Sequence, residues 1–153
     1  FKLKEKKEML VPNITLKVVR EKNHDYKIHS SNNAFDAITK NIRKEIEDSN
    51  IEIFGFVGME TNNRIVFVDD SMRGTVNEAS VYIAEIARKL LLTNCSQVIL
   101  FHNHPSGNLQ VSDADIRITE KIKQALNLFS IKVLDHLILS TDDFISFKEL
   151  GHL

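Results

Sequence analysis

The hydrophobic residues of this chain change their spacing several times, and this alternation constrains the fold more than any other feature. Three segments have apolar residues at helical spacing: about 33–48, around 83–91 and about 112–128. Runs typical of β-strands lie between and around these helices, at about 14–18, 51–58, 64–68, 98–101, 131–140 and 144–147. Strands that alternate with helices favour an α/β fold, with a mixed β-sheet and flanking helices.

Individual segments add detail to this order. Thr61-Asn62-Asn63 lies between two β-rich runs and predicts a hairpin turn. The continuous apolar run Val98–Phe101 is typical of a central strand that is buried on both faces. We expect the inward faces of the three helices to consist of Phe35, Ile38, Ile42, Ile46, Ile83, Ile86, Ala87, Leu90, Leu91, Ile118, Ile122, Ala125, Leu126 and Phe129.

Composition narrows the class of protein. The chain has 153 residues, of which 42% are hydrophobic, and this is enough for one ordinary domain with a core. Its single cysteine, Cys95, excludes a disulfide framework and a thiolate zinc finger, and we expect this residue in the core. A net charge of −1 gives no support to nucleic-acid binding, although it does not exclude a local basic patch. Without a long apolar run or a signal segment, we expect a cytoplasmic protein that has no membrane partner.

The segment His102-Asn103-His104-Pro105-Ser106-Gly107 joins the end of the central strand to the start of the third helix. In α/β domains, ligands bind beyond the carboxyl ends of strands. His102 and His104 are two residues apart, so on extended backbone their imidazoles point to the same side. Asp115, in the first turn of the helix, can aim its carboxylate at both rings. Two imidazoles and one carboxylate leave one position open for water, which is the ligand count of a catalytic zinc site.

These residues also have plainer interpretations. Ser112-x-x-Asp115 is a helix-capping signature, with serine at the N-cap and an acid three residues later. Either histidine, taken alone, is more often a surface or core residue than a metal ligand. A capping role for Ser112 does not compete with a second role, and the joint pattern favours a metal site.

The spacing His102-x-His104-Pro105-x6-Ser112-x2-Asp115 resembles the signature of the JAMM (MPN-plus) metalloprotease superfamily. The longer motif, which extends through Thr119 and Leu134-Asp135-His136, is similar to the bacterial RadC branch of that superfamily. Glu52-Ile53-Phe54-Gly55 matches the E-x-x-G pattern that the family has on an upstream strand. On this resemblance we divide the chain into a charged N-terminal tail, 1–12, and a RadC-like JAB/MPN domain, 13–153.

The resemblance implies the MPN/JAB architecture, which is cytidine deaminase-like, and a set of site residues. His102, His104 and Asp115 would bind Zn²⁺, and Glu52 would hold and deprotonate the metal-bound water. Ser112 would donate a hydrogen bond to that water or to the oxyanion. His136, on a strand beside the core, would either orient one of the metal ligands or fill space.

Two features depart from the family pattern. Many RadC-like proteins carry an N-terminal helix-hairpin-helix region, which makes a role on DNA plausible, whereas the first 30 residues here are typical of a tail and a strand. Val111 stands where the family usually has a proline before the motif serine. That substitution loosens the loop without removing a ligand.

Three functions stay open. The leading hypothesis is a zinc-dependent metallohydrolase that cleaves an amide bond, with a peptide or protein conjugate as its substrate. The alternative is a DNA repair or DNA-processing accessory protein, in which the basic stretch Lys2–Lys22 would contact phosphates. The third is a binding module that keeps the fold without catalysis. A deaminase of the related fold is disfavoured because the sequence has no P-C-x-x-C motif.

Overall fold

A computed structural model of the chain describes residues 17–19, 25–48, 50–74 and 79–153. The charged tail predicted at 1–12 and most of the strand predicted at 14–18 lie outside these ranges. The described residues 17–19 form no regular element, and the side chain of Val18 is 50% exposed. The prediction of a half-buried strand is therefore wrong for residues 17 and 18, the described part of that strand.

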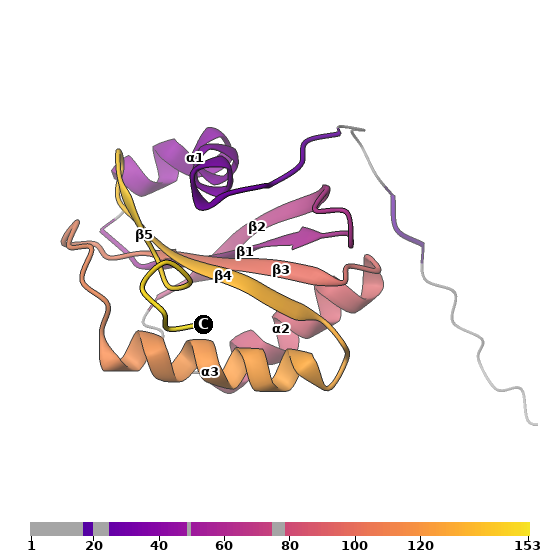
Figure 1. The fold of residues 1–153 in the computed structure, drawn as a ribbon. Coiled ribbons are helices and arrows are strands. Elements are labelled where there is room, and N and C mark those ends of the chain that lie inside the picture. Colours follow the sequence, from indigo (N-terminus) through magenta and orange to yellow (C-terminus); the bar gives the residue numbers. More distant parts are fainter. Residues whose placement is uncertain (1–16, 20–24, 49, 75–78) are drawn as a thin grey trace, which may run out of the picture.

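In the described part of the chain, three helices cover the two faces of one five-stranded sheet (Figure 1). The elements follow in the order α1 (Ser31–Asp48), β1 (Ile53–Met59), β2 (Ile65–Arg73), α2 (Ala79–Leu92), β3 (Gln97–Asn103), α3 (Asp113–Asn127), β4 (Lys132–Leu139) and β5 (Phe144–Ser146). The strand order across the sheet is β2-β1-β3-β4-β5. Among the strands of the described residues, β3 and β4 alone pair in parallel, so the predicted α/β fold with a mixed sheet is confirmed.

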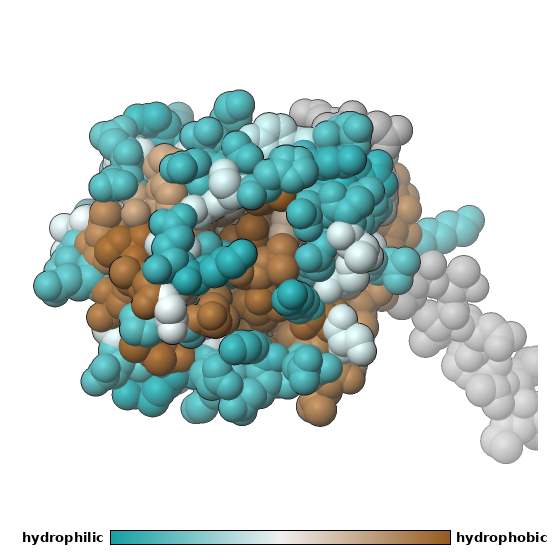
Figure 2. Space-filling model, in the orientation of Figure 1, coloured by the Kyte–Doolittle hydropathy of each residue, from teal (hydrophilic) through white to brown (hydrophobic). Residues whose placement is uncertain are grey.

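Each face of the sheet packs against a hydrophobic core of its own. Helix α1 covers one face, and α2 and α3 lie together on the other (Figure 1). The outward surfaces of α1 and α3 carry hydrophilic residues, which line the top and bottom of the space-filling view (Figure 2). The amphipathic pattern of these helices explains their place, because each buries one apolar stripe against the sheet. The core beneath α1 contains Ala34, Ile38, Ile42, Ile46, Val57, Ile99 and Leu137.

The close pairing of β1 with β3 brings the start of one strand to the end of the other. Phe54 lies opposite His102 in this antiparallel register. A Cβ atom at Gly55 would lie 2.2 Å from Cζ of Phe101 and 2.4 Å from the carbonyl oxygen of Asp69. Only glycine therefore lets β1 pack this closely between its neighbours. The residue just before β1 consequently lies near the carboxyl end of β3.

Two of the residues expected on inward helix faces are exposed instead. The side chain of Leu91 is 49% exposed and that of Phe129 is 50% exposed. Phe129 continues the helical spacing but lies beyond the end of α3, where the chain has already turned toward β4. The burial of Cys95 and the hairpin turn at Thr61-Asn62-Asn63 are confirmed. Within the described ranges, no helix combines the length and apolar character needed to cross a membrane.

Candidate metal centre

Four titratable side chains meet at the carboxyl end of β3. His102 belongs to β3, His104 follows that strand, Asp115 lies in the first turn of α3, and Glu52 directly precedes β1. One nitrogen or carboxylate oxygen from each of these side chains lies within 4.8 Å of the others. Because all four atoms are good metal ligands and they converge on one place, the cluster could hold a metal ion.

The carboxylate of Asp115 spans the two imidazoles. Its Oδ1 lies 3.2 Å from Nε2 of His102, and its Oδ2 lies 3.5 Å from Nε2 of His104. The two Nε2 atoms are 3.0 Å apart. The His102 side chain is buried, whereas that of His104 is 20% exposed, so solvent reaches the cluster from the His104 side. The expectation that Asp115 faces both rings agrees with this geometry.

Ser112 holds Asp115 in place at the start of α3. The two residues form the predicted capping box: the Asp115 amide donates to Oγ of Ser112, and the Ser112 amide donates to Oδ2 of Asp115 at 2.9 Å. The Ser112 hydroxyl also donates to Oδ2 at 2.7 Å. Burial alone would raise the pKa of the Asp115 carboxyl, but the hydrogen bonds and charge of His102 and the bonds from Ser112 hold it well below its ordinary value. Asp115 is therefore a carboxylate at neutral pH.

The ring of His104 is oriented by a backbone carbonyl. Its Nδ1 lies 2.7 Å from the carbonyl oxygen of Asn108, which can only accept, so Nδ1 carries a proton. In the neutral ring, Nε2 then presents its lone pair to His102 and Asp115. Several acceptors facing one another at these distances are stable only with a proton or a cation among them. This is the chemistry expected of a metal site.

Glu52 is positioned through its backbone. The Gly74 amide donates to the Glu52 carbonyl oxygen at 2.9 Å. The next amide, that of Ile53, donates to Oδ1 of Asn103 at 2.7 Å. Asn103, the last residue of β3, thus links the segment of the two histidines to the residue beside Glu52. Asn103 was not among the predicted site residues, and its only signal in the sequence is its place between His102 and His104.

His136 lies on β4 behind His102, and its ring is fully buried. Nε2 of His136 is 2.8 Å from Nδ1 of His102, and its Nδ1 is 2.5 Å from Oγ1 of Thr119. Burial, assisted by the charge of His102, lowers the pKa of His136 well below its ordinary value. The ring therefore stays neutral. The neighbouring Asp135 accepts hydrogen bonds from Ser146 and two backbone amides instead, so it serves the packing of β4 and β5.

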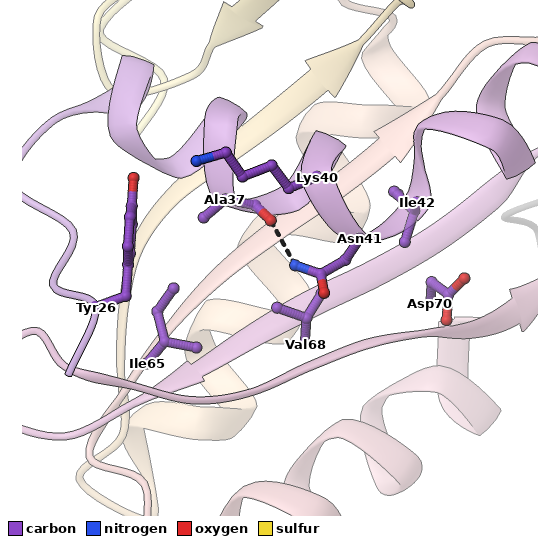
Figure 3. A pocket seen from close by; sticks show the side chains of 8 residues that line it. All are labelled: Tyr26, Ala37, Lys40, Asn41, Ile42, Ile65, Val68 and Asp70. Atoms are coloured by element: carbon purple, nitrogen blue, oxygen red, sulfur yellow. Dashed lines mark hydrogen bonds between the residues drawn. The ribbon is translucent and has the colours of Figure 1, made fainter. Parts of the chain in front are cut away.

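A cavity of about 270 Å³ adjoins His104. It lies between the end of α1, the 103–107 loop and the turn after β4. A larger cavity of about 520 Å³ lies elsewhere, between α1 and β2 (Figure 3). None of the four cluster residues lines that second cavity, and its Asn41 amide already donates to the carbonyl oxygen of Ala37 at 2.7 Å. Of these two cavities, the one beside His104 adjoins the cluster.

The fold and the cluster define an α/β domain with a candidate metal centre at the end of a central strand. The family model described as the RadC-like JAB domain matches residues 28–152. The chain belongs to this family, as the resemblance of its motifs implied.

Curated relatives carry the name UPF0758 protein. The protein from Thiobacillus denitrificans is 39% identical over 117 residues, which are 76% of this chain and 52% of the relative. The one from Janthinobacterium sp. is 36% identical over 134 residues, which are 88% of this chain and 60% of the relative. A third, from Chromohalobacter salexigens, is 41% identical over 102 residues, 67% of this chain and 46% of the relative. The chain thus spans about half the length of the curated relatives it matches.

Proposed function

We propose that this domain is a zinc-dependent metallohydrolase that cleaves an amide bond in a peptide or a protein conjugate. The proposal is carried by one observation: ligand atoms of His102, His104 and Asp115 converge with a carboxylate of Glu52 beside them. Three protein ligands with an accompanying carboxylate are typical of catalytic zinc sites, whereas structural sites use four ligands from the protein.

The distances within the cluster suit zinc. Atoms bound to a tetrahedral ion by bonds of about 2.0–2.1 Å lie about 3.3 Å from one another. The Nε2 atoms of His102 and His104 are 3.0 Å apart, and they lie 3.2 Å from Oδ1 and 3.5 Å from Oδ2 of Asp115, respectively. A bound zinc ion would polarise the scissile carbonyl and bring the pKa of a water molecule down to about 7.

The protein's own residues have distinct roles in this proposal. The Glu52 carboxylate accepts a proton from the attacking water and returns it to the nitrogen of the leaving amine. The Ser112 hydroxyl holds the Asp115 carboxylate, and to assist the developing oxyanion it would have to turn its proton away from Oδ2 of Asp115. The cavity beside His104 offers room for a substrate group next to the scissile bond. No serine or cysteine nucleophile is needed.

The experiment compares two variants on the same panel of peptides and ubiquitin-like conjugates. Glu52→Gln should keep zinc at the wild-type stoichiometry and lose about 10²- to 10⁴-fold in turnover, because the amide cannot take up the proton. His104→Ala should lose both zinc and turnover. Zinc content is measured on each purified protein. Wild-type turnover by Glu52→Gln would contradict the role of Glu52, and a wild-type chain without zinc at neutral pH would contradict the proposal as a whole.

The DNA-processing alternative stays a prediction. Of the basic stretch Lys2–Lys22 on which it depends, the structure describes only residues 17–19, whose side chains are exposed. The zinc hydrolase is therefore the function that we propose. We also propose that the protein is cytoplasmic and that its partner is a peptide or a protein conjugate.

A further inference from the structure

We infer that Thr119 and His136 form a hydrogen-bond relay that fixes the tautomer of His102, so that Nε2 of His102 presents its lone pair to the metal position. This inference rests on the zinc site proposed above. Neither Thr119 nor His136 belongs to the group of candidate ligands. Both are positioning residues, because they act on the metal position through His102.

The direction of the relay is set at Thr119. Its Oγ1 lies 2.6 Å from the carbonyl oxygen of Asp115, one helical turn earlier in α3. A carbonyl oxygen can only accept, so the single hydroxyl proton of Thr119 is donated there. Nδ1 of His136 lies 2.5 Å from the same Oγ1. Because the hydroxyl has no second proton to give, Nδ1 of His136 must be the donor in this contact.

The same rule determines which nitrogen of His102 bears the proton. A neutral imidazole has one N–H, so Nε2 of His136 bears a lone pair. This atom lies 2.8 Å from Nδ1 of His102, which therefore donates its proton to it. When His102 is neutral, its Nε2 is therefore bare and faces His104 and Asp115; when His102 is charged, its second proton lies on Nε2 and points to Asp115. The ligand atom is selected by a chain of bonds that starts at a backbone carbonyl.

Aromatic packing keeps the ring of His136 in this orientation. Phe54 meets it edge-on with ring centroids 5.5 Å apart, and Phe147 lies against it at 4.7 Å. A ring rotated by half a turn about the Cβ–Cγ bond would bring the carbons Cδ2 and Cε1 to the places where Nδ1 and Nε2 now lie. The hydrogen bonds of the ring to Thr119 and to His102 would then both be lost.

The opposite tautomer of His136 would disable His102. A proton on Nε2 of His136 would face Nδ1 of His102, which would have to accept it. The proton of a neutral His102 would then sit on Nε2, where a metal must bind. For His104 the Asn108 carbonyl performs the equivalent task without a relay. The two histidines thus reach the same tautomer by separate routes.

Thr119→Val and Thr119→Ser test the relay as a matched pair. Valine has the shape of threonine but removes the acceptor for Nδ1 of His136, whereas serine keeps the hydroxyl. Zinc affinity is measured by competition with a chromogenic chelator, on the full chain of each variant. Thr119→Val should bind zinc about 10- to 100-fold more weakly, the range found when partners of metal-binding histidines are removed. Thr119→Ser should stay close to the wild type.

A second measurement reads the tautomer itself in the metal-free protein. Long-range nitrogen–proton correlation spectra of the histidine rings should show His136 protonated on Nδ1 in the wild type and in Thr119→Ser. Protonation of His136 on Nε2 in the wild type, or equal zinc affinity in Thr119→Val and Thr119→Ser, would overturn the relay. If the wild type shows the expected tautomer but binds no zinc, the proposed function fails while the relay is supported.

Discussion

Oδ1 of Asn103 accepts a hydrogen bond from the Ile53 amide at 2.7 Å, and this contact ties together the two strands that carry the candidate site. Asn103 lies between the two histidines, and Ile53 follows Glu52. Asn103 is buried, so breaking this bond would leave a buried amide without its acceptor. The place of the carboxylate relative to the imidazoles thus depends on an amide that is not itself a candidate ligand.

Asn103→Ala should therefore lower both stability and turnover. Leaving a buried amide without an acceptor costs about 1–3 kcal/mol in the free energy of unfolding. Urea unfolding measures this loss, and Asn32→Ala, at an exposed position of α1, serves as the control with a change below about 0.5 kcal/mol. Equal stability of the two variants would show that the bond to Ile53 contributes nothing.

Gly55→Ala should destabilise the domain more than Gly58→Ala. A Cβ atom at Gly55 would meet the backbone oxygen of Asp69 at 2.4 Å, which cannot move without displacing β2. At Gly58 the close atoms belong to the side chains of Phe67 and Cys95, and the half-buried Phe67 can give way. Overpacking costs about 1–3 kcal/mol or more, and thermal unfolding of the two variants compares the sites. A larger loss in Gly58→Ala would contradict this explanation of the E-x-x-G glycine.

Ser112→Ala removes the N-cap of α3 together with the hydroxyl that holds Asp115. The loss of a serine cap costs about 0.5–2 kcal/mol. We also expect weaker zinc binding, because the carboxylate loses the hydroxyl donor that holds Oδ2. Ser112→Thr keeps an oxygen at this position and should recover most of both properties. Unchanged zinc affinity in Ser112→Ala would restrict Ser112 to capping the helix.

Acid should destabilise the metal-free domain partly through Asp69. Burial alone would raise the pKa of this carboxyl, but bonds from Lys89, at 2.5 Å, and from Ser71 lower it below its ordinary value. A lowered pKa contributes stability that is present above the unfolded value, about 3.9, and lost as the pH falls through the folded value. Unfolding free energies at about pH 5 and about pH 3 should therefore differ less in Asp69→Asn than in the wild type. An equal difference would exclude this contribution.

The fold could be predicted largely from the periodicity of apolar residues. Helix α3 shows why, because its inward stripe and its Ser112 cap are both local features of the sequence. Leu91 and Phe129 were wrongly predicted to be buried, because their exposure is not determined by local features. They continue the helical spacing, but whether another element covers them depends on the tertiary structure, which periodicity does not contain.

The sequence likewise predicted some residues of the candidate site and missed others. The spacing of His102, His104 and Asp115 along one strand, loop and helix indicated their convergence. Glu52 lies far from them in the chain and was identified only through the resemblance to a family. The roles of Asn108 and Thr119 could not be predicted, because one acts through its backbone carbonyl and the other through a contact with β4.

Anomalous scattering at the zinc absorption edge, from a crystal of the zinc-loaded chain, would show whether zinc binds among these side chains. We predict one strong peak, with Nε2 of His102, Nε2 of His104 and a carboxylate oxygen of Asp115 about 2.0–2.2 Å away. The Glu52 carboxylate should lie beside the fourth position. A crystal without a peak among these side chains, or with the two imidazoles turned away from each other, would contradict the account.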